Sequence, residues 1–554
     1  MVDVAGAPPR VSRLVEDDRP PVVEDDRRPS GLLRANAAVA AGTLASRITG
    51  LVRVALLVSV VAATLADSYN TANNIPNVVY ELILGGVLTA TLVPLFTEQA
   101  MRHDEDATSA VVSVGVVVLA LLSIVATLLS PLIVRLYTFN TPADADPETF
   151  RTVTTFFAFF FLPQIFFYGI TALASALLNA RRRFFAAAWA PVLNNLVVIA
   201  ALLALPALVN QTPRDILLAD RNSTLRLVLA ISTTGGIVMT ALALLPALRN
   251  AGVHLRWRLQ WSHPAVRQVL ALSSWTIGYV IANQVALYTM TVLAKPGSGG
   301  VTSYQAAFVL FQMPVGLLAV SIMTTFGPDL ARARVQRDRP MFLGRMSLGL
   351  RSLALVTMPA AALLVALARP VVGVVLEHGF FEASQADVTS GALAAFAVGL
   401  FALAAYLFIL RGFFAHNDTR TPFVLNVFEN GLNIAFGLLL VGSFGVPGLA
   451  WSFTIGYAAA SLLAFYVLTV KVRGVDVMEL GISLGRIALA AIVAGEVAWL
   501  VSQAVGSDSG TGALARVAAG SLAGSLTYIL LLSFLQVPEV GQLVRRLRRR
   551  SSTP

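Results

Sequence analysis

The chain contains no cysteine, and charged residues make up only 13% of its 554 positions. The absence of cysteine excludes disulfides and cysteine-based metal sites. A soluble domain averages about 25% charged residues. The scarcity of charge, together with a hydrophobic content of 56%, therefore predicts an all-α polytopic membrane protein with many spans and little soluble mass.

Sequence signs of catalysis and of metal binding are also missing. The chain has no phosphate loop, nucleophile elbow or zinc motif, and its outer connections are too short to hold a catalytic domain. The histidines lie near predicted loops without the spacing of metal ligands: His103, His254, His263, His378 and His416. We therefore expect no enzyme, no metal site, and no cofactor other than an unidentified coupling ion.

Lysine is nearly absent, since Lys295 and Lys471 are the only lysines and arginine supplies the remaining positive charge. The net charge of +10 could indicate a nucleic-acid partner, but the basic residues occupy alternate loops, as membrane topology requires. We expect no nucleic-acid binding. The run Arg545–Arg550 is interpreted as a cytoplasmic end that touches anionic lipid, with nucleic-acid binding as the alternative.

A spanning helix needs roughly 20 mostly apolar residues, and about fourteen segments meet this requirement. They lie near 37–64, 71–97, 108–136, 152–178, 187–209, 225–248, 267–294, 302–326, 346–367, 388–414, 422–442, 446–470, 484–505 and 512–535. An even number of spans keeps the arginine-rich loops and the C-terminal arginines on one side. The sequence therefore predicts a multi-pass membrane protein with both termini cytoplasmic.

Two similar stretches indicate an internal repeat: Asn179–Arg181 followed by Pro191–Asn194, and Asn417–Arg420 followed by Pro422–Asn426. Their separation nearly equals that between the first and seventh predicted spans, which favours duplication over chance. Such a repeat predicts two parallel six-helix lobes, which is a transporter architecture. The predicted parts are a disordered cytoplasmic tail at 1–35, lobes at 36–250 and 251–475, two extra helices at 476–540, and a basic cytoplasmic tail at 541–554.

Two arginines interrupt the first apolar segment. Arg47, Gly50 and Arg53 are spaced i, i+3, i+6, so a helix places them within an arc of about 120°, with the arginines about 9 Å apart along the axis. An arginine near a bilayer centre costs about 2.5–3.5 kcal/mol, whereas a cationic cavity could bind phosphate oxygens bidentately. The alternative is pairing with one of the intramembrane acids: Glu81, Glu429 or Glu496.

Two proline breaks lie in predicted spans. Pro76 is followed by Asn77 and Tyr80 in the second span, and Gln312 precedes Pro314 in the eighth. Proline removes a backbone donor and permits bending. The asparagines near Pro76 suit hydrogen bonding to a glycan, although a solvated helix start explains them equally well.

Glu429 and Asn433 share one helix face at i, i+4 spacing in the eleventh span. They could bind Na⁺ or a proton, and a buried hydrogen-bond network is an equally good interpretation. Arg351 in the ninth span is either a further buried charge or a side chain that reaches the cytoplasmic surface.

Several short motifs form an ordered set along the chain: Ser46–Arg53, Asp67, Pro76-Asn77, Gly86, Pro94, Glu377–Phe381, Asn417–Pro422 and Gly445–Ala450. Together they resemble the motifs of the MurJ (MviN) family, whose SRxxGxxR motif corresponds to Ser46–Arg53. The resemblance implies a location in the bacterial plasma (inner) membrane. The resemblance covers about 36–545.

The resemblance implies a MATE-like fold of fourteen helices, shared with multidrug and oligosaccharide exporters. It implies a lipid II flippase that moves this undecaprenyl-pyrophosphate disaccharide-pentapeptide from the inner to the outer leaflet by alternating access. The last two spans would form a groove for the lipid tail. Partners would be lipid II, membrane lipids and cell-wall synthesis proteins.

The resemblance also assigns roles to residues. Substrate-binding residues would be Ser46, Arg47, Gly50, Arg53, Asn77, Tyr80 and Gln312. Gate residues would be Asp67 and Pro76. The family signature would comprise Arg351, Asn417, Asp418, Arg420, Thr421 and Pro422.

The chain departs from the family pattern in its predicted cavity. Other members often have arginine where this chain has Tyr80 and where Val309 aligns, and an acid where it has Gln312. Arg47 and Arg53 would therefore carry more of the anion recognition.

The sodium site described for some members is matched only in part. Asn433 aligns with it, but the acid expected one turn later is Gly437. Ion coupling therefore stays open.

Three other functions compete with lipid II transport. An exporter of drugs or of another polyprenyl-linked glycan could share the fold. A non-transporting scaffold for cell-wall synthesis would not need buried arginines. An intramembrane glycosyltransferase would need a carboxylate pair, and none stands at a plausible site.

Overall fold

The structure is a computed structural model that describes residues 29–81, 92–102, 104–416, 418–474 and 476–535. Within these ranges the chain is helical and contains no strand, as the composition predicted. The first helix, α1 (Pro29–Val60), begins inside the segment that was expected to be a tail up to residue 35. The remainder of that predicted tail lies outside the described residues.

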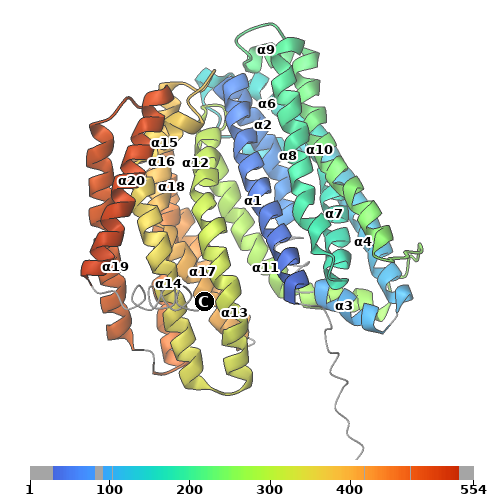
Figure 1. The fold of residues 1–554 in the computed structure, drawn as a ribbon. Helices are drawn as coiled ribbons and strands as arrows, with labels where there is room; N and C mark the ends of the chain where they lie inside the picture. Colours follow the sequence, from blue (N-terminus) through green and yellow to red (C-terminus); the bar gives the residue numbers. More distant parts are fainter. Residues whose placement is uncertain (1–28, 82–91, 103, 417, 475, 536–554) are drawn as a thin grey trace, which may run out of the picture.

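Helices α1 to α10 form the first lobe, on the right of the bundle in Figure 1. Helix α8 packs between α1 and α10, while α2 packs on α6 and α4 on α7. Their bounds, after α1, are α2 Ala63–Glu81, α3 Val93–Met101, α4 Glu105–Leu128, α5 Ser130–Tyr137, α6 Pro147–Phe161, α7 Gln164–Ala180, α8 Phe184–Leu208, α9 Ile216–Arg221 and α10 Ser223–Asn250.

Helices α11 to α18 form the second lobe, in which α18 is packed by α11, α16 and α17. The bounds are α11 Pro264–Leu293, α12 Gly300–Pro314, α13 Val320–Val335, α14 Arg339–Ala366, α15 Ala368–Val375, α16 Ala383–Val398, α17 Leu400–Ala415 and α18 Arg420–Lys471. Two further helices, α19 (Val477–Gln503) and α20 (Gly510–Phe534), pack on α14 and α15 at the left edge of Figure 1.

Ten helical segments in the described residues are long and apolar enough to cross a membrane, and the bent pair of α16 and α17 makes eleven. Helix α18 folds back on itself at Gly445, whose φ of 59° and ψ of −138° are not helical. This reversal matches the predicted turn at 443–445. The predicted total of about fourteen spans stays a prediction, since residues 82–91 of the second predicted span lie outside the described residues.

Each lobe has its own apolar core. Tyr69, Phe157 and Phe161 meet edge-to-face in the first lobe, and Phe311, Phe396 and Phe453 form a similar cluster in the second. Large apolar side chains also cover the outward faces of the bundle, including those of α19 and α20. An apolar exterior around packed helices is what a lipid environment requires.

The two ends of the bundle are named here by one aspartate each. The Asp67 end lies beside α9 at the top of Figure 1, and the Asp418 end lies beside α13 at the bottom. The lobes meet mainly where α12 packs against α1 and α2, and where α11 packs against α2, α4 and α5. This boundary holds the candidate site.

Candidate functional site

Arg47 reaches from the first lobe into the second. Its half-buried side chain donates from Nη1 to the main-chain oxygen of Gln312, at 3.3 Å. It also lies against Gly316, where a Cβ atom would come within 2.2 Å of the Arg47 Cζ atom. The contact falls at the predicted break of the eighth span, where Pro314 is followed by a π-helical turn at Val315–Ala319. Single π turns of this kind often mark functional sites.

Arg53 lies two turns further along α1 and is also half-buried. Its side chain makes no hydrogen bond or ion pair with any described residue. Among the described residues, neither Arg47 nor Arg53 pairs with Glu81, Glu429 or Glu496. The alternative of an ion pair with one of these three acids is not seen among the described residues, and anion binding by the two arginines stays a prediction.

Helix α8 holds α1 beside these arginines. The Asn195 side-chain amide donates to the Ser46 carbonyl and to the Thr49 hydroxyl, both at 3.0 Å. The nearest atom to a Cβ on Gly50 would be the same amide nitrogen, at 3.6 Å. Ser46 and Gly50 therefore pack within the first lobe, and ligand contact by their side chains stays a prediction.

The remaining predicted binding residues and the predicted gate residue Pro76 differ in what the structure shows for them. Asn77 accepts a hydrogen bond from the Tyr168 hydroxyl at 3.1 Å, so its amide oxygen is already used. Pro76 is buried within α2. The side chain of Tyr80 lies outside the described residues. Gln312 contributes its main-chain oxygen to Arg47, a role that residue type alone could not reveal.

Asp67 joins the two lobes at a different place on their boundary from Arg47. Its fully buried carboxylate accepts main-chain N–H groups from Gly297 at 3.0 Å, Gly299 at 2.8 Å and Thr302 at 2.8 Å. The charge therefore sits at the N-terminus of α12, where the unpaired N–H groups favour an anion. Asn70 adds a bond to the Thr302 hydroxyl at 3.0 Å. We call Asp67 and its three N–H donors the Asp67 latch.

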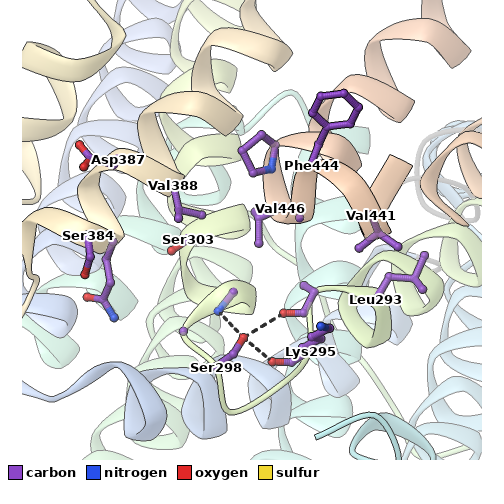
Figure 2. Close-up of a pocket in the computed structure, with 16 residues that line it drawn as sticks. Leu293, Lys295, Ser298, Ser303, Ser384, Asp387, Val388, Val441, Phe444 and Val446 are labelled. Atoms are coloured by element: carbon purple, nitrogen blue, oxygen red, sulfur yellow. Dashed lines mark hydrogen bonds between the residues drawn. The ribbon is translucent and has the colours of Figure 1, made fainter. Parts of the chain in front are cut away.

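The turn that donates to Asp67 depends on glycine. Gly297 has a φ of 98° and Gly299 a φ of 83°, which other residues adopt only at a cost. The other side of this turn borders a pocket of about 610 Å³ lined by α16 and the α18 reversal. Figure 2 shows Ser298 bonded within the turn, to the carbonyls of Ala294 and Lys295 and from the N–H of Gly300.

The Glu377–Phe381 motif makes a second contact between the lobes at the Asp67 end. The Phe380 N–H donates to the Ser59 carbonyl at 3.1 Å. Gly379 has a φ of 61°, and a Cβ there would lie 2.0 Å from the same oxygen. Arg369 ties the loop down by pairing with Glu377 and with Asp387, each at 2.6 Å. Sequence resemblance located this motif, but its docking onto α1 was not predicted.

Helix α11 makes a third contact at the same end. The Tyr288 hydroxyl donates to the Leu136 carbonyl at 2.8 Å, and Asn140 donates to the Val292 carbonyl at 3.0 Å. Tyr288 also stacks edge-to-face on Tyr137. Three separate contacts therefore close the lobes together at the Asp67 end.

The signature around Asp418 has a different role. Asp418 accepts hydrogen bonds from the N–H and hydroxyl of Thr421, at 3.0 and 2.7 Å, and from Lys471 at 2.6 Å. Burial raises the pKa of Asp418, but the bonds from Lys471 and Thr421 outweigh it and lower the pKa to about 2. Arg420 is exposed and Pro422 is buried in the first turn of α18. The signature thus caps α18 within one lobe.

Two signature residues remain, Asn417 and Arg351. Asn417 lies outside the described residues. Arg351 is nearly buried and pairs with Glu479 at 2.9 Å, which ties α14 to the first turn of α19.

A long apolar groove lies on the second lobe and has a volume of about 750 Å³. It is lined mainly by α14, α17 and α19, and includes Phe401, Ile492 and Trp499. None of the described residues that line it comes from α20, and a tail groove formed by both extra helices stays a prediction. Helix α20 instead packs closely on α19 through Gly520 and Gly524.

Glu429 and Asn433 are buried deep in the second lobe, at 1% and 5% exposure. Asn433 accepts from the Ser452 hydroxyl at 2.9 Å. At Gly437, a Cβ atom would meet Met290 and Ser452, neither of which is an acid. The structure tests neither residue for ion coupling, which stays a prediction.

Comparisons with known proteins give a consistent result. The sequence model of the family described as "Lipid II flippase MurJ" matches residues 59–519. The chain is 30% identical over 444 residues to the "Probable lipid II flippase MurJ" of Rhizobium meliloti, covering 79% of this chain and 80% of that protein. It is 28% identical over 463 residues to the "Lipid II flippase MurJ" of Burkholderia cenocepacia, covering 80% and 84%.

Solved structures show the same fold. A structure titled "Lipid II flippase MurJ, inward closed conformation" superposes with a TM-score of 0.73 at 20% identity, covering 91% of this chain and 99% of that one. An inward-facing multidrug resistance MATE family transporter of the MOP superfamily superposes with a TM-score of 0.62 at 13% identity, covering 79% and 99%. The two-lobe, MATE-like architecture predicted from the sequence is confirmed.

Proposed function

Because the chain belongs to the lipid II flippase MurJ family, we propose that it moves lipid II across the bacterial plasma membrane by alternating access. Transport runs from the inner to the outer leaflet. The positions of the arginine-rich loops support an orientation with the Asp418 end in the cytoplasm and the Asp67 end outside. The observation that carries the proposal is the pair Arg47 and Arg53, which have no acidic partner among the described residues at the lobe boundary.

The arginines suit the charged part of this substrate. A guanidinium group stays ionised and binds phosphate oxygens through two parallel hydrogen bonds. The bond from Arg47 to the Gln312 carbonyl is long, at 3.3 Å, so a pyrophosphate oxygen can replace that neutral acceptor with a charged one. Arg53 makes no bond with a described residue that an anion would have to replace. The two groups are therefore poised to receive an anion between the lobes.

The latched end supports the direction of access. Contacts at Asp67, Phe380 and Tyr288 close the lobes on the outer side. Substrate therefore enters from the cytoplasmic leaflet, and the Asp67 end opens later in the cycle. Substrate shifts this equilibrium only by binding one state more tightly than the other, and the Arg47 contact across the lobes supplies such a difference.

The apolar groove suits the polyprenyl tail. Its walls at α14, α17 and α19 carry the partly buried Phe401 and the exposed Ile492 and Trp499, and it opens on the lipid-facing side of the second lobe. The tail can remain there while the head group passes between the lobes. This arrangement avoids moving a long hydrocarbon chain through a polar path, which would carry a large transfer free energy.

Depletion and complementation test the proposal. Cells that lose the native protein receive wild type, Arg47→Ala, Arg53→Ala or the control Arg135→Ala, whose side chain is exposed on α5. Membrane levels are checked by blotting, and outer-leaflet lipid II is measured by an accessibility assay. We expect the control to restore exposure and growth, and each site variant to reduce exposure by at least about tenfold, the effect of one lost charged contact.

The outcomes separate the competing functions. Normal lipid II exposure in depleted cells would mean that the chain exports another compound or serves as a scaffold for cell-wall synthesis proteins. Normal exposure with a well-expressed Arg47→Ala or Arg53→Ala protein would remove the role of the arginines. Arg47→Lys refines the result, because it keeps the charge but loses the two-pronged geometry.

A further inference from the structure

One buried acid lies well apart from the arginines. Glu429 is on the first pass of α18, is 1% exposed, and makes no side-chain hydrogen bond or ion pair with any described residue. Its Oε2 atom is buried without a partner. On the adjoining pass of the same helix, a Cβ on Gly456 would lie 3.1 Å from the Glu429 carbonyl oxygen. The side chain is thus enclosed where both passes of α18 pack together.

The surroundings of Glu429 are polar but uncharged. Tyrosines from four helical segments lie near its carboxyl group, and among the described residues no cationic side chain forms an ion pair with it. These residues are Tyr279 of α11, Tyr304 of α12, Tyr406 of α17 and Tyr457 of the second pass of α18. The Tyr406 hydroxyl and the Asn426 amide oxygen are also buried without partners. Three unsatisfied polar atoms therefore share this region.

A buried carboxylate without a cation or donors costs several kcal/mol, so a proton or a metal cation must neutralise it. Two nearby amide oxygens are already used, since Asn283 accepts from Asn426 and Asn430, at 2.9 and 2.8 Å, and Asn433 accepts from Ser452. The free Asn426 oxygen can accept a hydrogen bond from a protonated carboxyl group. Among the described residues there is no group of three or more acidic, histidine or cysteine side chains that could hold a metal ion. A proton satisfies the site with the least rearrangement.

The place of Glu429 links it to the lobes. Helices α11 and α12 pack on α18, and the turn between them carries Gly297 and Gly299 of the Asp67 latch. Helix α12 also carries the Gln312 carbonyl that receives Arg47. A change in the charge of Glu429 would alter how these two helices pack, and both lobe contacts depend on them.

We propose that Glu429 is a proton-binding site of the transport cycle, occupied by a proton while the Asp67 latch is closed. The carboxylate gains one proton to become a neutral carboxylic acid, and loses it to water when the lobes rearrange. No other bond is made or broken. This coupling role rests on the proposed transport function, but proton occupancy can be measured without any transport.

Infrared difference spectroscopy on the purified full-length protein in vesicles tests occupancy. At neutral pH we expect the carbonyl band of a protonated buried carboxylic acid in the wild type. The band should be lost in Glu429→Gln, shifted in Tyr406→Phe, and retained in Glu148→Gln, whose side chain is exposed on α6. A band that persists in Glu429→Gln, or its absence from the wild type, would overturn the proposal. If Glu429→Gln does not fold, the presence or absence of the Tyr406→Phe shift decides the matter.

Transport with an imposed pH gradient tests coupling. Wild-type vesicles should move lipid II at a rate that depends on the gradient, and Glu429→Gln should lose this dependence while Glu148→Gln keeps it. If sodium raises the unfolding temperature of the wild type but not of Glu429→Gln, the site binds a metal cation. That result would overturn the proposal of proton binding. Wild-type vesicles that show the acid band but move no lipid II would contradict the proposed function and leave proton binding intact.

Discussion

Asp67 and Asp418 lie at opposite ends of the bundle, and both accept hydrogen bonds from main-chain N–H groups at the start of a helix. The two contacts have different structural consequences. Asp67 accepts N–H groups at the start of α12, and Asp418 accepts the N–H of Thr421 at the start of α18. Each therefore caps a helix. Asp67, however, belongs to the first lobe and caps a helix of the second, whereas Asp418 caps the helix that follows it in the chain.

The comparison shows that the position of a cap, rather than its chemistry, decides whether it serves stability or movement. A cap within one lobe is present in every state of that lobe and adds to folding stability. A cap between lobes exists only while they are closed together, so it adds to the free energy of one conformation. Asp67 is fully buried because it lies between the lobes, whereas Asp418 is partly exposed at the end of one lobe.

The largest effect is expected from Asp67→Ala. The substitution leaves three buried N–H groups without an acceptor in the latched state, and each unsatisfied donor costs about 1–3 kcal/mol. We expect the population of the unlatched state to rise by about 100-fold. Because the chain has no native cysteine, spin labels on cysteines at Asp144 and Lys295, both exposed, report the separation of the lobes without background.

Asp418→Ala with the same labels is the matched control for Asp67→Ala. It should lower the unfolding temperature and leave the label distances unchanged. A shift in those distances with Asp418→Ala, or none with Asp67→Ala, would mean that the two caps are equivalent and the comparison does not hold.

A smaller effect is expected from Gly299→Ala. Its φ of 83° costs an alanine about 1–2 kcal/mol, and the new Cβ would lie 3.0 Å from Gln385 Nε2 and 3.2 Å from Ala63 Cβ. We expect about a tenfold rise in the unlatched population, read from the same labels. Gly510→Ala places similar strain at a φ of 61° with no atom within 4 Å, so it should reduce stability and leave the latch closed.

The smallest effect is expected from Asp418→Asn, and it depends on pH. The pKa of Asp418 is lowered to about 2 from an ordinary value of 3.8. The ionised carboxylate therefore stabilises the folded protein fully above its ordinary pKa, and this contribution is lost as the pH falls towards 2. Asp418→Asn should lower stability at pH 7 by about 0.5 kcal/mol, as expected of a partly exposed ion pair, and this difference should shrink below about pH 4.

Thermal unfolding at several pH values measures this difference. Adding Lys471→Ala to Asp418→Asn should cost little more than Asp418→Asn alone if the two side chains act as a pair. A difference that is constant from pH 7 to pH 3 would show that the charge of Asp418 contributes nothing.

Much of the α1 site could be predicted from the sequence. The i, i+3, i+6 spacing placed Arg47 and Arg53 on one arc of a helix, and both are half-buried on α1. Helical periodicity determines such relations because it is local. It could not identify the acceptor of Arg47, because the Gln312 carbonyl belongs to the backbone and every residue carries one.

Contacts between distant segments could not be predicted from the sequence. The described residues that line the apolar groove come mainly from α14, α17 and α19, whereas α20 packs on α19 and α15. Gly520 and Gly524 in α20 are the signal that was missed, since small residues let two helices approach closely. The docking of Gly379 against Ser59 likewise has no counterpart in either local sequence.

By itself the sequence determined that this chain is a two-lobe, all-helical membrane protein of the MurJ family with two arginines on one face of its first helix. Those properties follow from composition, periodicity and ordered motifs, which are local or additive along the chain. Only the tertiary structure decided that Asp67 spans the lobes while Asp418 does not, that Glu429 lacks a partner among the described residues, and that α20 lies outside the groove. Each of these properties depends on which buried polar groups and helix faces meet between segments that are far apart in the sequence. The neighbours of a residue in the chain do not encode its partner in a distant segment.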